Sequence, residues 1–227
     1  SSWYSKRGFD TKKIYPFAYF MSDKISKIVH SGKRLPRFRF IYVGQLIERK
    51  RLDVLIKALS QLKNSMNFEL QVVGNGPLKK KLILLADKLL PKRVQWLGST
   101  SIKNIPKKIA GADCLVLPSR HDGWGSVVSE SLMVGTPVIC SDNCGALTAV
   151  KASKVGGTFN TDNISKFSLI LKRTLKEGRI SNQKRNKLRK WAKCLGAKEG
   201  SKYLLNILKF SQGQGYRPKP PWIKAGR

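Results

Sequence analysis

Residues 38–62 read FRFIYVGQLIERKRLDVLIKALSQL, and this stretch decides the class of fold. Its first seven residues form an apolar run that ends in a glycine, a pattern typical of a buried parallel strand. Its second half repeats apolar residues at helical spacing. These residues are Leu52, Leu55, Ile56, Leu59 and Leu62. The stretch therefore predicts a strand, a loop over residues 44–50 and then a helix.

The same alternation of strand and helix continues to residue 141. Further strands are predicted at FELQVVG (68–74), RVQWLG (93–98), CLVLP (114–118) and PVICS (137–141). Helices are predicted between them, over residues 78–90, 105–111 and 126–134. This order predicts an α/β fold with a Rossmann-like, doubly wound parallel sheet, in which ligands bind at the carboxyl ends of the strands.

Helices dominate the predicted structure beyond residue 160. Residues 161–163 are expected to cap a first helix, which Gly178 ends. Ser181 is expected to cap a second, strongly basic helix, and a third helix is expected over about residues 198–210. The chain is thus divided into residues 1–36, a Rossmann-like domain with its C-terminal helices over 37–212, and an irregular basic tail over 213–227. Within the first segment, KIYPFAYF (13–20) is compatible with a strand.

The chain carries a large excess of positive charge. It has 45 Lys and Arg residues against 13 Asp and Glu residues, which gives a net charge of +32. Residues 101–150 are balanced in charge, whereas residues 172–202 hold many bases and only Glu177 and Glu199 as acids. Such a surface attracts polyanions, either nucleic acid or the headgroups of an anionic membrane. A solvated lysine-rich surface without a partner is the alternative.

Several classes of site are disfavoured. Cys140 and Cys144 have no second pair or histidine cluster that would complete a metal site, so no metal is expected, and the four cysteines suit a reducing compartment. The turn GNGP (74–77) is followed by Lys79 where a dinucleotide fingerprint needs glycine, and no Gly-Lys-Ser/Thr phosphate loop is present. An NAD enzyme or an ATPase is therefore disfavoured.

The stretch RHDGWGSVVSE (120–130) combines a turn with two carboxylates. Glycines let the backbone approach a ligand closely, and a helix beginning near Ser126 would direct its unpaired N–H groups to the same place, which suits a phosphate. Glu130, about one helical turn further on, is placed to accept hydrogen bonds from adjacent hydroxyls such as those of a ribose. Asp122 could then face the reacting end of the ligand. A capped helix with two exposed acids is the alternative.

Four blocks of the sequence resemble the retaining GT-B glycosyltransferases of family 4, also called group 1. They are FIYVGQLIERKRLDVLIKAL, LQVVGNGPLKKKL, VQWLGST and ADCLVLPSRHDGWGSVVSESLMVGTPVICSDNCGA. They cover about residues 38–146 in the family's order, and the last block is highly specific. The resemblance implies that residues 37–212 bind a nucleotide-diphosphate sugar, with UDP or GDP as the nucleotide, and need no other cofactor.

The resemblance also implies roles for individual residues. Asp122 would lie near the transferring sugar, Lys50 would bind the phosphates, and these two are the candidate catalytic residues. Glu130 would bind the ribose. The remaining candidate donor-binding residues are Gly44, Gln45, Gly98, Ser99, Thr100, Gly125, Ser126 and Val127.

The sequence departs from the family in three places. Gln45 stands where the family usually has an arginine, and Asp122 stands where it usually has a glutamate. Either change could be compensated by Arg49 or Arg51, or could mark reduced or altered activity. GT-B enzymes also have a preceding acceptor domain, whereas residues 1–36 are only long enough to be an interdomain connection. We therefore expect a donor-binding half that is incomplete and inactive alone.

The resulting hypothesis is a hexosyl-type transferase that passes a sugar to a glycan or lipid-linked acceptor with retention, in cell-surface polysaccharide or lipopolysaccharide synthesis. It would be cytoplasmic and peripheral on the inner face of the membrane, with its basic surface against anionic lipid; nucleic acid is not expected as its partner. Two alternatives stay open. One is a non-catalytic polyanion-binding module on a glycosyltransferase-like scaffold, and the other is a nucleotide-sugar epimerase.

Overall fold

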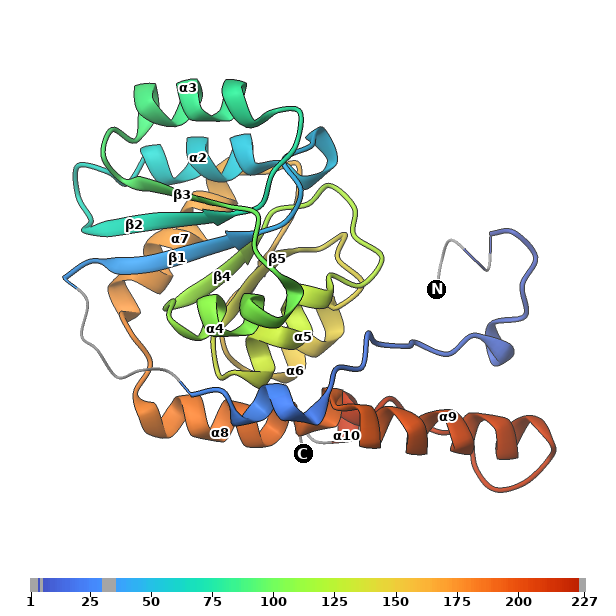
Figure 1. Ribbon diagram of the computed structural model, residues 1–227. Coiled ribbons are helices and arrows are strands. Elements are labelled where there is room, and N and C mark those ends of the chain that lie inside the picture. Colours follow the sequence, from blue (N-terminus) through green and yellow to red (C-terminus); the bar gives the residue numbers. More distant parts are fainter. Residues whose placement is uncertain (1–3, 5, 30–35, 225–227) are drawn as a thin grey trace.

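The computed structural model describes residues 4, 6–29 and 36–224. Its centre is a six-stranded parallel sheet in the order β3-β2-β1-β4-β5-β6 (Figure 1). The strands are β1 (Phe38–Val43), β2 (Phe68–Val73), β3 (Val94–Gly98), β4 (Cys114–Leu117), β5 (Val138–Ser141) and β6 (Gly157–Phe159). The predicted doubly wound fold is confirmed. Its order reverses between β1 and β4, the point at which such sheets bind ligands.

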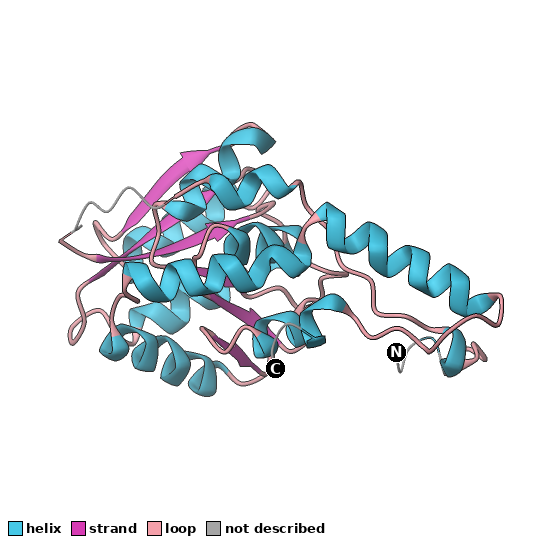
Figure 2. Cartoon of the chain, turned by 90° about the horizontal axis from the view of Figure 1, so that it is seen from below, coloured by secondary structure: helices cyan, strands magenta, loops and turns pink. Residues whose placement is uncertain are grey.

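Helices cover both faces of the sheet (Figures 1 and 2). On one face lie α2 (Leu52–Ser60), α3 (Lys79–Leu89) and α7 (Ile164–Glu177). On the other lie α4 (Ile105–Ala110), α5 (Ser126–Met133), α6 (Leu147–Ala152) and α8 (Asn182–Ala192). The strands β4 and β5 are buried along their whole length, which explains why their sequences are continuous apolar runs rather than an alternating pattern.

The C-terminal helices begin where the sequence predicts them. The side chain of Asn163 accepts a hydrogen bond from the amide of Lys166 at the start of α7, and that of Ser181 accepts one from Lys184 at the start of α8. Gly178 ends α7 with a φ of 71°. The long helix α9 (Ala197–Ser211) then extends away from the sheet beside the N-terminal segment (Figure 1).

The structure differs from the sequence-based expectation at both ends of the chain. Residues 14–20 form no strand; only Met21 makes a single bridge, to Gly196. The tail is not irregular throughout, because Pro221–Lys224 forms the short helix α10. The helix α6 and the strand β6 were also not predicted, since elements of six and three residues are too short to show a period.

Candidate functional site

Lys50 and Asp122 meet at the point where the strand order reverses. Lys50 ends a short 3-10 helix that follows β1, and Asp122 lies in the loop after β4. The Lys50 Nζ donates to the Asp122 Oδ2 at 2.5 Å, and the hydroxyl of Ser119 donates to the same oxygen at 3.4 Å. Two loops that are far apart in the sequence thus place a cation and a carboxylate side by side at the carboxyl edge of the sheet.

The turn that contains Asp122 is locked against the loop after β5. The amide of Asp122 donates to the carbonyl of Asn143 at 3.2 Å, and the amide of Gly145 donates back to the Asp122 carbonyl at 2.9 Å. A Cβ atom on Gly145 would lie only 1.8 Å from the carbonyl oxygen of Gly123. The two loops therefore touch through their backbones, and a glycine is required at the contact.

Gly125 begins α5 in a left-handed conformation, with a φ of 79°. A side chain there would be strained, and its Cβ would lie 2.7 Å from Leu117. The amides of Ser126 and Val127, in the first turn of α5, have no intrahelical acceptor, and no side chain of the described residues caps this helix end. The helix start is thus suited to bind an anion such as a phosphate.

Glu130 lies in the same helix and is nearly fully buried, with 4% of its surface exposed. Its Oε2 has no hydrogen-bond partner among the described residues. Burial raises the pKa of its carboxyl to about 7. An unpaired buried carboxylate is costly, so the site favours a ligand that donates hydrogen bonds to this oxygen. The alternative of two exposed acids is wrong, because Asp122 is also buried.

The remaining candidate donor-binding residues lie in the loops after β1 and β3. Gln45 is exposed, and its carbonyl accepts the phenol of Tyr42 at 2.8 Å. Next to it, a Cβ on Gly74 would lie 1.9 Å from the carbonyl of Gly44, so the loops after β1 and β2 are in backbone contact. Gly98 ends β3 at a φ of 64° and is followed by the exposed Ser99 and the half-buried Thr100.

The two arginines that could compensate for Gln45 are both held by backbone carbonyls. Arg49 donates to the carbonyl of His121 at 2.9 Å, directly before Asp122. Arg51 donates to the carbonyl of Thr161 at 2.8 Å. Both cations thus stay at the carboxyl edge of the sheet.

One part of the site was not predicted from the sequence. Trp124, in the turn between Asp122 and Gly125, is buried, and its ring lies 5.1 Å from that of Trp222 in the tail. Tryptophan within a glycine turn is a signal that could have been used, but no local pattern marks its partner. The described residues contain no cluster of His, Cys, Asp and Glu that could hold a metal ion.

Comparison with known proteins assigns the fold to one family. The family model of the group 1 glycosyl transferases matches residues 23–194. A galactosyltransferase of the lipopolysaccharide outer core, WaaB, superposes with a TM-score of 0.74 at 21% identity, covering 93% of this chain and 59% of that protein. Anabaena HepE, solved with UDP and glucose, superposes with a TM-score of 0.64 at 20% identity, covering 76% of this chain and 48% of that one. The likeness to these structures shows that the fold is shared.

Curated relatives agree in sequence over part of their length. An N-acetylgalactosaminyltransferase of Campylobacter jejuni that acts on a diphospho-undecaprenol-linked sugar is 30% identical over 169 residues, which are 72% of this chain and 45% of the relative. Granule-bound starch synthase 1 of Ipomoea batatas is 29% identical over 53% of this chain and 20% of the relative. The chain thus spans less than half the length of these relatives. With a family model that matches most of its residues, the chain belongs to the group 1 glycosyltransferases.

Proposed function

We propose that this chain is the donor-binding half of a glycosyltransferase and that it binds a nucleotide-diphosphate sugar at the carboxyl edge of its sheet. The observation that carries the proposal is the buried, unpartnered Oε2 of Glu130 on a helix whose open N-terminus lies beside Lys50 and Asp122. Phosphate oxygens suit the helix start and the ammonium group, and ribose hydroxyls suit the carboxylate. Both parts of a nucleotide are thereby matched.

In the proposed reaction, this half stabilises the departing nucleoside diphosphate. Negative charge that develops on the leaving phosphate would be met by the Lys50 ammonium and by the amides of Ser126 and Val127, with no reorganisation of the backbone. Lys50 would then exchange its ion pair with Asp122 for contacts to phosphate. Asp122 would face the transferring sugar, and the transfer would retain the anomeric configuration, as the resemblance to family 4 implies.

The relatives suggest which nucleotide base and which class of acceptor to propose. HepE was solved with UDP, and the Campylobacter relative acts on a lipid-linked diphosphate sugar. We propose a UDP-sugar donor, with GDP as the alternative base, and a glycan or lipid-linked acceptor in cell-surface polysaccharide or lipopolysaccharide synthesis. The acceptor would bind to an N-terminal half that covers the exposed apolar residues of α9. These residues are Leu204, Leu205 and Leu208.

A thermal-shift screen tests donor binding. UDP or GDP at a hundred times its dissociation constant should stabilise the chain by about 2.7 kcal/mol, whereas CMP should stabilise it less because it lacks the second phosphate. Lys50→Met should remove most of the shift. Lys57→Met, which changes an exposed lysine of α2 paired with Asp53, should leave it intact. If neither diphosphate raises the melting temperature, or if both variants respond alike, donor binding at this site is wrong.

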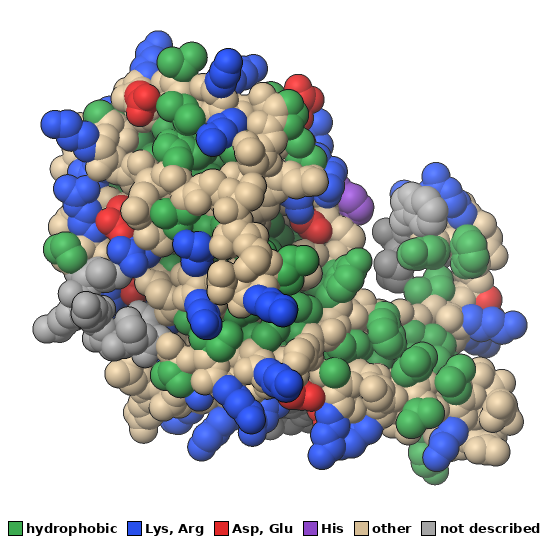
Figure 3. Space-filling model, in the orientation of Figure 1, with side chains coloured by type: hydrophobic (Ala, Val, Ile, Leu, Met, Phe, Trp, Pro, Cys, Tyr) green, Lys and Arg blue, Asp and Glu red, His purple; other side chains and the backbone are tan. Residues whose placement is uncertain are grey.

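A second function is favoured by the surface of α8. Lys184, Lys187, Lys190 and Lys193 are exposed, and none of them forms an ion pair with an acid of the described chain. Basic side chains gather along the lower edge of the molecule, where α8 lies (Figure 3). Lysine clusters on a helix attract anionic lipid headgroups by about 1 kcal/mol per residue.

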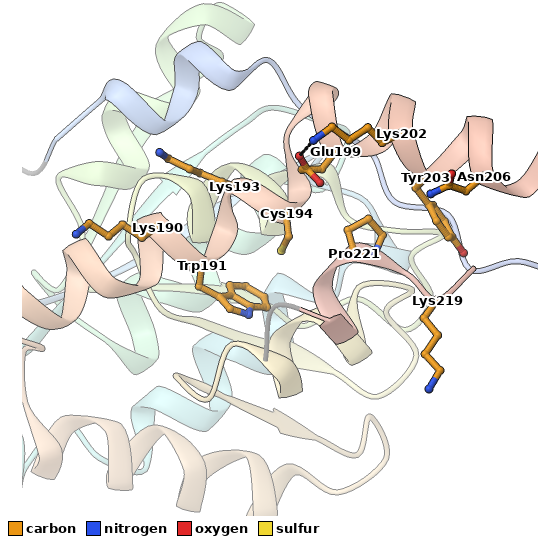
Figure 4. A pocket seen from close by; sticks show the side chains of 10 residues that line it. All are labelled: Lys190, Trp191, Lys193, Cys194, Glu199, Lys202, Tyr203, Asn206, Lys219 and Pro221. Atoms are coloured by element: carbon orange, nitrogen blue, oxygen red, sulfur yellow. Dashed lines mark hydrogen bonds and ion pairs between the residues drawn. The ribbon is translucent and has the colours of Figure 1, made fainter. Parts of the chain in front are cut away.

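Two cavities flank Trp191 on this surface. One, of about 790 Å³, is edged by Lys154, Lys184 and Lys187. The other, of about 680 Å³, lies between Trp191 and Tyr203 and is edged by further lysines (Figure 4). Trp191 is half-buried between them. Tryptophan is enriched where membranes meet water. We propose that this surface binds a bilayer containing anionic phospholipid.

Charge reversal distinguishes binding of lipid by the α8 surface from binding that depends only on the net charge of the protein. The triple variant Lys184→Glu, Lys187→Glu, Lys190→Glu should lower binding to vesicles with 30% phosphatidylglycerol at least about a hundredfold, since three attractions become repulsions. Lys80→Glu, Lys81→Glu, Lys88→Glu makes the same change of charge on α3 and should lower it less than about fivefold. Equal losses in sedimentation assays would show that only net charge matters. Binding to an RNA duplex but not to vesicles would overturn the lipid proposal.

A further inference from the structure

The C-terminal tail returns from the end of α9 and inserts one side chain into the body of the protein. Trp222, in α10, has no exposed surface and is the largest fully buried side chain of the described chain. Its Nε1 donates to the hydroxyl of Thr148 in α6 at 3.1 Å. Its ring lies 5.1 Å from that of Trp124 at an angle of 59°, and 6.3 Å from that of Phe20. The tail is therefore part of the core rather than a loose extension.

Trp124, the partner of Trp222, connects the two loops of the candidate donor site with α5. Its Nε1 donates to the hydroxyl of Ser129 at 2.9 Å, one residue before Glu130. Its carbonyl accepts the amide of Ala146 and the thiol of Cys144, both at 3.1 Å. Trp124 thus holds together the turn before α5, the loop after β5 and the helix that carries Glu130.

The tail is held at a second point, close to the N-terminal segment. The guanidinium of Arg217 donates to the carbonyls of Lys12 and Ile14, the latter at 2.9 Å, and lies 4.6 Å above the ring of Tyr15. Residues 218–221 therefore run between two anchored positions, Arg217 beside the segment that precedes β1 and Trp222 beside the donor turn. This anchoring distinguishes the tail from a terminus that only rests on the surface.

We propose that Trp222 is a positioning residue of the donor site: by packing on Trp124 it holds the turn 122–125 and the start of α5 in the geometry that binds a nucleoside diphosphate. The proposal rests on the proposed function for the identity of the ligand. Trp222 touches neither Lys50 nor Glu130 in the described contacts, so its effect passes through Trp124. An aromatic pair contributes free energy beyond that of its buried area. This extra free energy corresponds to about a tenfold change in an equilibrium constant.

The test compares Trp222→Ala, Trp222→Phe and wild type by calorimetric titration with UDP and GDP. The alanine variant should bind about tenfold more weakly, and the phenylalanine variant should recover binding to within about threefold because it restores the ring contact. Phe167→Leu serves as a matched control, since it disturbs the ring stacked on Phe159 on the other face of the sheet. This control should lower stability and leave the affinity unchanged. Wild-type affinity in Trp222→Ala would overturn the proposal.

A measurement without ligand separates this proposal from the proposed function. The amides of Val128, Gly145 and Ala146 donate to carbonyls of the turn 122–125, so their hydrogen exchange reports whether the turn keeps its geometry. Exchange at these amides should accelerate in Trp222→Ala but not in Phe167→Leu. Thr148→Val, at an exposed position, removes only the anchor of the indole and should give a smaller effect of the same sign. Unchanged exchange would refute positioning by Trp222, whereas a wild type that binds no nucleotide would refute only the proposed function.

Discussion

Glu130→Ala is expected to weaken the binding of a nucleoside diphosphate by about a hundredfold. A carboxylate that accepts two hydrogen bonds from the ribose contributes roughly 1.5–3 kcal/mol for each bond, and 3 kcal/mol corresponds to that factor. Glu177→Ala is the matched control, because Glu177 is exposed on α7 and, among the described residues, forms an ion pair with Arg173 alone. Isothermal titration measures both dissociation constants. Equal affinity in the wild type and Glu130→Ala would show that the carboxylate does not bind the nucleotide.

The same residue gives the donor site a pH dependence. Burial raises the pKa of Glu130 from its ordinary value of 4.5 to about 7, and only the ionised form accepts hydrogen bonds from both hydroxyls. Affinity for a nucleotide sugar should therefore rise from pH 6 to pH 8 and then level off. A nucleotide sugar is the right probe, since its diphosphate does not titrate in this range. Glu130→Gln should give a flat profile.

The stability of the ligand-free protein should change in the opposite direction. Between pH 4.5 and 7 the folded state retains a proton on Glu130 that the unfolded state releases. The free energy of unfolding therefore decreases as pH rises through this window, and the Glu130 contribution is fully lost above pH 7. Glu130→Gln removes the slope. As the proton on Glu130 is lost, the affinity for the nucleotide sugar thus rises while the free energy of unfolding of the ligand-free protein falls. This is expected for a buried carboxylate whose hydrogen-bond partners come from a ligand.

The sheet and much of the candidate site could be predicted because their signals are local. Each buried strand is a short apolar run, each following helix has its own period, and a parallel sheet brings all strand ends to one edge. This is why the sequence alone predicts that Lys50 and Asp122, which are 72 positions apart, lie at the same edge of the sheet. The glycine turn likewise carries its own conformational signal at Gly125.

The contacts that could not be predicted join distant residues without a repeating pattern. Trp222 lies 98 positions from Trp124, in a segment whose composition of proline, glycine and lysine indicates irregular structure. The four residues of α10 gain their stability from the buried indole and not from helix propensity. The strand β6 is defined by its pairing with β5, which no property of three residues reveals.

The second large effect is expected at a buried charge network beneath α8. Asp113 is 3% exposed and accepts hydrogen bonds from the backbone amide of Arg39 at 2.8 Å, from Arg179 at 3.0 Å and from Arg185 at 3.5 Å. Arg185 is itself only 4% exposed, and burial lowers its pKa. It also donates to the carbonyl of Ala112 at 2.9 Å, so it fixes α8 to the residues just before the start of β4.

Asp113→Asn should lower the free energy of unfolding by about 3–5 kcal/mol, because it keeps the shape of the side chain but leaves the Arg185 charge buried without compensation. For a chain of this size that corresponds to a fall of about 10 °C in the melting temperature. Asp162→Asn, at a side chain that is 89% exposed, should shift it by less than about 2 °C.

Calorimetry of the double variant Asp113→Asn, Arg185→Met distinguishes the two reasons why the network could matter. If the cost comes from the orphaned cation, the double variant should regain most of the lost stability, since a buried ion pair can often be replaced by apolar contacts. If Asp113 acts instead through its bond to the Arg39 amide, the double variant should remain as unstable as the single one.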